Sequence, residues 1–126
     1  MSMTPQQLVA EAKTQISEIG VNAAAQHIAA GAVVVDVREP AEFSADSLPN
    51  AVNIPRGVLE FKTSDHPALA NKDADILLYC KTGGRSALAT ASLQRLGYTK
   101  VASILGGFDA WASSQPVVRD TTDFGS

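Results

Sequence analysis

The sequence predicts an α/β protein with a parallel sheet of four to five strands and helices on both faces. Compact apolar runs at 33–35 and 76–79 are typical of strands that are buried on both faces. Segments with a helical pattern alternate with these runs, and glycine or proline stands at many of the boundaries. Strands that alternate with helices in this way favour a parallel sheet over an antiparallel one.

Helices are predicted where helix-forming residues follow a capping residue or stop at a glycine. Thr4 offers a hydroxyl at the N-cap and Pro5 fits the first helical position. Gly31 and Gly97 end two later helices. The predicted helices and short helical turns cover 6–14, 22–30, 40–45, 57–63, 67–71 and 86–96, and a last helix after Gly106-Gly107 holds Phe108 and Trp111, which we expect in the core.

Strands are predicted for the short apolar segments between these helices. The run of three valines at 33–35 is the strongest example, and Pro55 ends a weaker one. The predicted strands cover 16–19, 33–35, 51–54, 76–79 and 101–105. We therefore expect a helical extension at 1–15, one domain at 16–115 and a polar, loosely held tail at 116–126.

Composition limits the function classes. The 126 residues carry a net charge of −3, and no cluster of lysines and arginines forms a basic stripe, which argues against nucleic-acid or membrane-surface binding. A single cysteine excludes an internal disulfide and a multi-cysteine zinc site, and we expect no metal or cofactor. The start of the chain lacks a signal-peptide pattern and no apolar run is long enough to span a bilayer, so we expect a cytoplasmic protein.

The segment around that cysteine is the most informative part of the chain. Cys80 ends an apolar strand and precedes a short loop in which Gly83 and Gly84 allow backbone N–H groups to turn inward and form an anion nest. Arg85 adds a permanent charge, and Ser86 is a suitable N-cap for the next helix. A cysteine in this position alone is usually a small buried hydrophobe. The complete loop, however, would stabilise a thiolate, the nucleophilic form of cysteine.

Other polar residues are expected to reach the same edge of the sheet. Ligand sites of parallel sheets lie at the carboxyl ends of the strands. Asp36, Arg56 and Cys80 each follow a different predicted strand, and Gly106 follows a fourth. These loops should converge on one pocket, with Asp36, Arg38 and Arg56 as possible pocket or supporting residues.

Several separated motifs together resemble those of the single-domain rhodaneses. The loop fits the family pattern C-x-x-G-x-R-S. Further matches are D-V-R-E-P-x-E-F at 36–43, N-I-P at 53–55, L-x-x-x-G-Y ending in Gly97 and Tyr98, and G-G-F-x-A-W at 106–111. One departure lies at 46–51, where D-S-L-P-N-A replaces the common G-H-I-P-G-A. Ser47 stands in place of the histidine there, and we expect only a modest structural change.

The resemblance implies a rhodanese-like fold and a sulfurtransferase that uses a persulfide on Cys80. The donor would be a small sulfur anion such as thiosulfate, and the acceptor would be cyanide, a cellular thiol or a sulfur-accepting protein. Lys81 and Arg85 would attract the donor. The predicted substrate-binding residues are Lys81, Thr82, Gly83, Gly84, Arg85 and Ser86. For the acidic motif at 36–43 we expect a structural network of ion pairs and turns.

The sequence alone leaves other functions open. Cysteine phosphatases also use a loop from Cys to Arg, but they place five residues between the two, whereas only Lys81, Thr82, Gly83 and Gly84 intervene here. The shorter loop suits sulfur better than a tetrahedral phosphate. A binding or redox-sensing module without turnover, or a persulfide carrier in a delivery pathway, would use the same cysteine.

Overall fold

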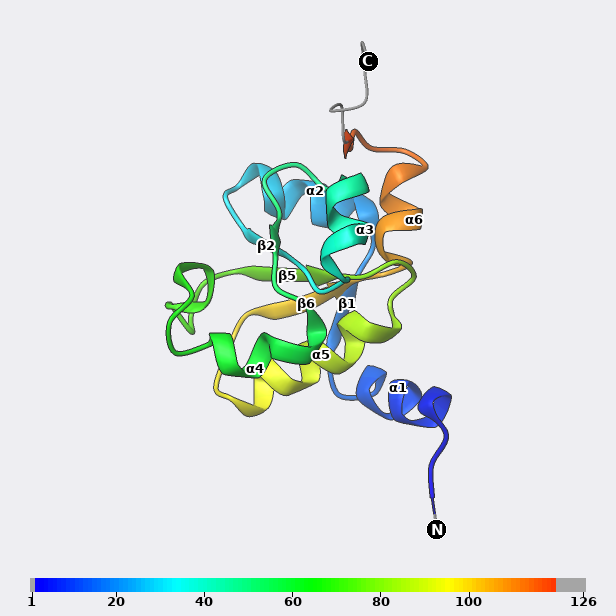
Figure 1. The fold of residues 1–126 in the computed structure, drawn as a ribbon, viewed down its shortest axis with the longest axis vertical. Helices are drawn as coiled ribbons and strands as arrows, with labels where there is room; N and C mark the ends of the chain where they lie inside the picture. The colour runs from blue at the N-terminus through cyan, green and yellow to red at the C-terminus, as the bar shows by residue number, and fades with distance from the viewer. Residues whose placement is uncertain (1, 120–126) are drawn as a thin grey trace.

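A computed structural model describes residues 2–119, and these form a parallel sheet with helices on both faces (Figure 1). The sheet has five strands in the order β1-β6-β5-β2-β4, and every pair of neighbours is parallel. This arrangement confirms the predicted fold class. The strands are β1 (Ser17–Ile19), β2 (Val33–Asp36), β4 (Val52–Asn53), β5 (Ile76–Tyr79) and β6 (Val101–Ile104).

The helices divide into two layers. Figure 1 shows α2 (Val21–Ala29), α3 (Pro40–Ala45) and α6 (Gly107–Ala112) on one face of the sheet, and α1 (Pro5–Lys13), α4 (Leu59–Lys62) and α5 (Gly84–Arg95) on the other. Two 3₁₀ turns, η1 (Arg56–Val58) and η2 (Pro67–Leu69), complete the connections. No helix among residues 2–119 is long and apolar enough to cross a membrane.

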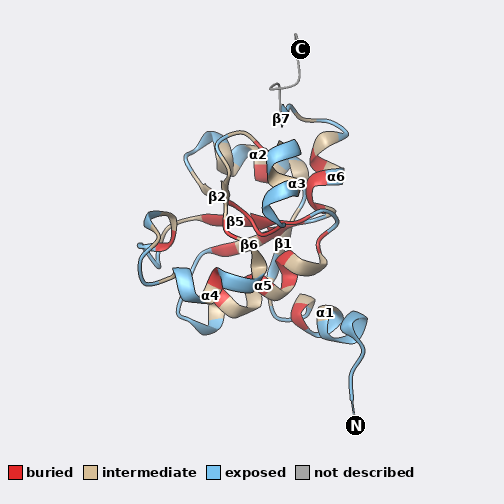
Figure 2. Ribbon diagram, in the orientation of Figure 1, coloured by how far each residue is buried: buried red, intermediate tan, exposed pale blue. Residues whose placement is uncertain are grey.

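The side chains of the central strands alternate between the two layers. In β5 every residue is buried: Ile76 and Leu78 join the core on the α5 side, whereas Leu77 and Tyr79 join the core on the α2 and α6 side. Figure 2 shows this concentration of buried residues in the middle of the sheet. Burial of each large aliphatic side chain contributes about 1.5–3 kcal/mol, so both cores hold the helices to the sheet. As expected, the last helix places its two aromatic residues in the core, because Phe108 and Trp111 are buried.

Strand register brings the functional loops to one edge of the sheet. Asp36 pairs with Tyr79 on one side and with Asn53 on the other, so β2, β4 and β5 end at the same level. Cys80 follows directly after Tyr79. The carboxyl ends of these strands therefore place Asp36 beside Tyr79, the residue that precedes Cys80.

The helix after the cysteine loop begins earlier than predicted. Helix α5 starts at Gly84, and Gly83 occupies the N-cap with φ 120°. The prediction that Ser86 is the N-cap is therefore wrong, since Ser86 lies inside the first turn. The physical reason is the left-handed backbone of Gly83, which turns the chain into the helix without a side-chain cap.

The part of the predicted tail that the structure describes includes a short strand. Val118–Arg119 forms strand β7, which pairs antiparallel with β3 (Asp46–Ser47) in a separate two-stranded sheet. Neither strand shows an alternating apolar pattern, so the pairing was not visible in the sequence. The rest of the predicted tail, 120–126, lies outside the described residues.

The departure from the family pattern at 46–51 has a local explanation. Asn50 is the only residue other than glycine with a positive φ among residues 2–119, at 61°. It stands where relatives commonly have glycine, and asparagine tolerates this left-handed conformation better than most residues. The backbone turn is thus kept without the glycine, in agreement with the expected modest change. Ser47, in place of the histidine, is buried in β3.

Candidate active site

The sulfur of Cys80 sits inside the loop between β5 and α5. The side chain is only 2% exposed, and Sγ accepts hydrogen bonds from the backbone N–H groups of Gly83 at 3.1 Å and Ser86 at 3.3 Å. The first turn of α5 adds the positive end of a helix dipole. Two amide donors and a helix N-terminus thus surround the sulfur with partial positive charge.

A pair of buried hydroxyl groups connects the sulfur site to β6. Ser86 Oγ is 3.6 Å from Cys80 Sγ, 3.3 Å from the carbonyl oxygen of Gly83 and 2.7 Å from Ser103 Oγ. Both serines are fully buried. Ser103 comes from β6, so this hydroxyl pair connects the start of α5 to the neighbouring strand. The pair keeps the first turn of α5, and with it the Ser86 amide, at a fixed distance from the sulfur.

The start of α6 holds the other side of the loop. The amides of Phe108 and Asp109 donate to the carbonyl oxygens of Cys80 at 2.8 Å and Lys81 at 3.1 Å. Gly107 makes this approach possible: a β-carbon there would lie 2.5 Å from the Cys80 carbonyl oxygen, and φ is 57°. The G-G-F motif therefore serves to hold the cysteine loop by backbone hydrogen bonds.

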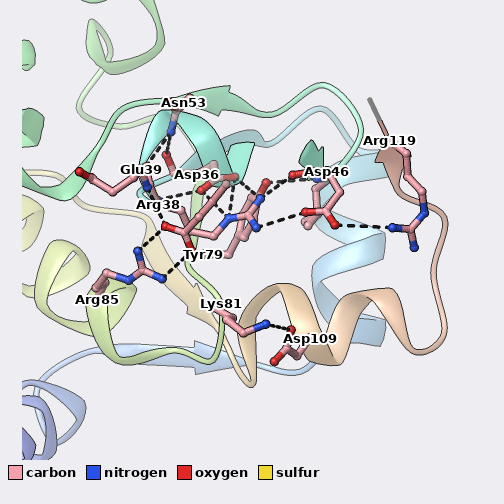
Figure 3. A network of polar contacts seen from close by, with 12 residues as sticks. Asp36, Arg38, Glu39, Asp46, Asn53, Tyr79, Lys81, Arg85, Asp109 and Arg119 are labelled. Carbon is pink, nitrogen blue, oxygen red and sulfur yellow. Dashed lines mark hydrogen bonds and ion pairs between the residues drawn. The ribbon is translucent and has the colours of Figure 1, made fainter. Parts of the chain in front are cut away.

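Arg85 is held by a carboxylate from α3. Its Nη1 and Nη2 donate to the two carboxylate oxygens of Glu42 at 2.8 and 3.1 Å (Figure 3). This bidentate hydrogen bond, opposed by partial burial, lowers the pKa of Glu42 to about 2 and raises the pKa of Arg85. The two side chains remain 33% and 39% exposed, so the pair lies at the rim of the site.

Lys81 and Thr82 are exposed on the loop. Lys81 Nζ is 3.1 Å from Asp109 Oδ1 of α6, with both side chains about half exposed or more. Lys81 and Arg85, the two cations predicted to attract an anionic donor, therefore each have a carboxylate partner. The rim of the site is balanced in charge.

Behind the loop lies a buried ion pair. Asp36 and Arg38 are almost fully buried, and Arg38 Nη2 donates to Asp36 Oδ2 at 2.7 Å (Figure 3). Burial by itself lowers the pKa of Arg38, but the hydrogen bond and charge of Asp36 hold it above its usual value. The guanidinium lies 4.7 Å from the ring centroid of Phe108 and 5.5 Å from that of Tyr79.

This ion pair connects several loops at the carboxyl edge. Arg38 also donates to the backbone oxygen of Asp46 at 2.6 Å, and Asn53 Nδ2 donates to the carbonyl oxygens of Asp36 and Arg38. Figure 3 shows the network reaching Arg119 of β7 through Asp46. Contacts of this kind agree with the structural network expected for the motif at 36–43. They also explain the N-I-P motif, whose asparagine fastens the loop after β2.

Arg56 has its hydrogen-bond partners in α4 and α5. Its guanidinium bonds Glu60 at 2.7 Å and approaches Ser92 of α5 at 3.4 Å, and it lines a cavity of about 180 Å³ between α1 and α5. Ser92 stands six positions after Ser86 along α5. The contacts of Arg56 thus join η1, α4 and α5.

The two histidines have different kinds of partner, one 48 positions away in the sequence and one local. His27 Nδ1 is 2.6 Å from Asp75 Oδ2, and His66 Nδ1 accepts from the Ala68 amide at 3.0 Å. Among residues 2–119, no group of three or more His, Cys, Asp or Glu side chains is arranged to hold a metal ion.

The sequence did not predict that three further residues contact the site. Ser103 and Asp109 carry no local signal, because their partners Ser86 and Lys81 lie in another part of the chain. Gly107 belongs to a motif that was recognised, but its contact with the cysteine loop was not predicted. Only the packing of β6 and α6 against the loop shows these roles.

Comparison with known proteins gives the class. The rhodanese-like domain family matches residues 21–114. A sulfurtransferase of Allochromatium vinosum is 38% identical over 80 residues, which cover 64% of this chain and 71% of that protein. The thiosulfate sulfurtransferase GlpE of Pseudomonas entomophila is 36% identical over 88 residues, covering 70% and 77%. The chain therefore belongs to the rhodanese-like domain family.

Solved structures support the same fold. The human single-domain sulfurtransferase TSTD1 superposes with a TM-score of 0.72 at 25% identity, over 79% of this chain and 97% of that chain. A Rhodopseudomonas palustris protein of unknown function, described as a possible tyrosine phosphatase, gives a TM-score of 0.80 at 30% identity over 94% and 96%. The second match extends over nearly the whole of both chains.

Proposed function

We propose that this rhodanese-type sulfurtransferase moves a sulfane sulfur atom from thiosulfate to a thiophilic acceptor through a persulfide on Cys80. The observation that carries the proposal is the pair of amide hydrogen bonds to Cys80 Sγ at the N-terminus of α5. These amide N–H groups are already in place before thiosulfate binds. They can therefore stabilise negative charge on sulfur without reorganisation.

The reaction has two balanced steps. The Cys80 thiolate attacks the outer sulfur of thiosulfate, a new S–S bond forms, and the old S–S bond breaks with its electron pair leaving on sulfite. The outer sulfur of the resulting persulfide is then attacked by cyanide, which leaves as thiocyanate and returns the electron pair to the Cys80 thiolate. No proton base is required in either step, because nucleophile and leaving groups are all anions.

The loop residues have distinct roles in this proposal. Amides between Lys81 and Ser86 bind the negative charge of the donor and then of the persulfide. Lys81 and Arg85, each paired with a carboxylate, line the rim through which the sulfur donor approaches, and Thr82 lies exposed beside them. The buried Asp36–Arg38 pair stabilises the carboxyl edge of the sheet next to the loop. Arg56 stabilises α5 through its contact with Ser92.

Burial of the thiol restricts the acceptor. Cys80 is 2% exposed, whereas a persulfide places its reactive sulfur about 2 Å farther out along the new S–S bond. An acceptor therefore meets the outer sulfur and not the cysteine itself. A small thiol or a sulfur-accepting protein with an exposed cysteine fits this geometry. We place the reaction in the cytoplasm, where a single thiol is kept reduced between turnovers.

Sulfur loading tests the proposal directly. After incubation with thiosulfate, mass spectrometry of the intact protein should show a gain of one sulfur atom, which cyanide removes. Cys80→Ser should gain none, and Ser113→Ala, a matched change at an exposed position, should load normally. Hydrolysis of aryl phosphates without sulfur loading would favour a phosphatase. Failure to load from any sulfane donor would favour a binding or redox-sensing role.

A further inference from the structure

Neighbouring helices cancel the positive charge that the cysteine loop carries. Residues 80–86 hold two cations, Lys81 and Arg85, and no carboxylate. The fold adds Asp109 from α6, whose Oδ1 is 3.1 Å from Lys81 Nζ, and Glu42 from α3, whose Oε1 is 2.8 Å from Arg85 Nη1 (Figure 3). A loop with two positive charges thus becomes a rim without net charge.

Other charges beside the loop add nothing positive to this balance. Lys13 Nζ lies close to Gly83, but it is paired with Glu18 of β1 at 3.2 Å. Glu39, the exposed N-cap of α3, stands three positions before Glu42 and has no ion-pair partner among residues 2–119. The whole chain carries a net charge of −3. A doubly charged anion that approaches the loop therefore meets no attractive excess of positive charge.

The charge at position 85 acts on the cysteine sulfur as well as on its partner. The hydrogen bond from Arg85 to Glu42 is the largest cause of the raised pKa of Arg85; burial opposes it, and the charges of Glu42 and then Cys80 add to it. Negative charge at Cys80 therefore acts on the Arg85 guanidinium. Glu42 is ionised throughout the neutral range, since its pKa is lowered to about 2. Its carboxylate opposes the effect of the guanidinium on any anion at the sulfur.

We propose that Glu42 and Asp109 are specificity-determining residues that lower the reactivity of Cys80 toward doubly charged donors and so favour sulfane donors with a single negative charge, such as hydropersulfide or thiosulfonate anions. This inference rests on the proposed sulfur transfer and names the class of donor for it. Thiosulfate, with two negative charges, is then a donor that the site accepts but does not favour.

The charge of the donor decides how strongly each carboxylate acts. Coulomb energy is proportional to the charge of the donor, so a dianion feels a given change in potential twice as strongly as a monoanion. A unit charge about 6–8 Å away in a medium like water alters the reaction rate of a monoanion about two- to threefold at low ionic strength. The corresponding effect on a dianion is the square of this, about four- to tenfold.

Two donors that differ in charge test this scaling. Methanethiosulfonate carries one negative charge and thiosulfate carries two. In both reactions the Cys80 thiolate forms a new S–S bond with the sulfane sulfur, and the old S–S bond breaks with its electron pair leaving on methanesulfinate or on sulfite. Second-order rate constants for sulfur loading, measured by mass spectrometry at low salt, give the charge preference. The ratio of the two constants within one variant cancels any loss of folded protein.

Glu42→Gln and Asp109→Asn should each raise loading from thiosulfate about four- to tenfold and loading from methanethiosulfonate about two- to threefold. Added salt should reduce both gains. Asp73→Asn is the matched control, because it changes the net charge by the same one unit and lies before β5 at the amino end of the sheet. This control should leave the ratio of the two rate constants as in wild type.

Alkylation of Cys80 reads the same potential without sulfur transfer. Iodoacetate is an anion and iodoacetamide is neutral, so the ratio of their rates should rise about two- to threefold in Glu42→Gln and in Asp109→Asn. If wild type loads sulfur but neither ratio exceeds that of Asp73→Asn, the inference is overturned and the transferase stands. If no donor loads sulfur but the alkylation ratio rises, the transferase is refuted and the carboxylates keep their role in excluding anions.

Discussion

Replacement of Glu42 by glutamine tests whether the rim pair with Arg85 stabilises the cysteine loop. The amide keeps an oxygen that can accept the Glu39 N–H, so the capping box of α3 is preserved. Only the charge, and with it the bidentate bond to Arg85, is lost. Any change in stability then reports on the pair that connects α3 to the first turn of α5.

The expected magnitude follows from the pKa of Glu42. A fall from 4.5 to about 2 corresponds to about 3 kcal/mol for a shielded group. Both side chains are, however, a third or more exposed, and solvent screening reduces such pairs to about 1 kcal/mol. Because the folded pKa lies below the unfolded one, this contribution is complete above about pH 4.5 and is lost as the pH falls toward 2.

Urea unfolding of wild type and Glu42→Gln between pH 7 and pH 3 measures the effect. The free energy of unfolding should differ by about 1 kcal/mol from pH 7 to pH 5, and the difference should shrink below pH 4.5. A cycle with Arg85→Gln and the double variant should give a coupling energy of the same size. No difference at neutral pH, or a difference that changes near pH 6, would refute the reasoning.

Three further substitutions test other parts of the site. Gly107→Ala should lower the free energy of unfolding by about 2–4 kcal/mol and abolish sulfur loading, because its β-carbon would lie 2.5 Å from a carbonyl oxygen. Gly20→Ala is the control: Gly20 has open space around it, so this variant should unfold in urea almost like wild type. Arg38→Met should lower the free energy of unfolding by about 3–5 kcal/mol, because it leaves the Asp36 carboxylate buried and unpaired. In thermal melts, the double variant with Asp36→Asn should recover part of this loss. Asn50→Gly should leave the free energy of unfolding nearly unchanged, whereas Asn50→Ala should lower it by about 1 kcal/mol, because φ is 61° at this position. Equal stability of the two variants would contradict the left-handed turn.

The charged side chains at the rim of the site neutralise one another. Lys81 and Arg85 each have a carboxylate partner, so neither presents an isolated cation to solvent. Hydrogen bonds to Cys80 Sγ come from the backbone of Gly83 and Ser86. In the proposed sulfur transfer, negative charge that develops in the loop would be met by these fixed amides.

Local features of the sequence were sufficient to predict the fold and to single out Cys80 as the candidate nucleophile. Apolar runs such as 76–79 identify buried strands, and glycines and capping residues such as Thr4 mark helix ends, because each depends only on nearby residues. The parallel order then follows from the alternation of strands and helices, and it brings the loops after β2 and β5 to one edge. The position of Cys80 at that edge needed no tertiary information.

Contacts between distant segments were decided only by the tertiary structure. Arg85 meets Glu42 across 43 positions, Ser86 meets Ser103 across 17, and β7 pairs with β3 without an apolar pattern in either strand. Partners of this kind are chosen by how helices and strands pack, and residue spacing along the chain carries no record of that packing. Local pattern along the chain was enough to place Cys80 at the carboxyl edge of the sheet, and the packing of α1, α3 and α6 around the loop decided which charges surround it.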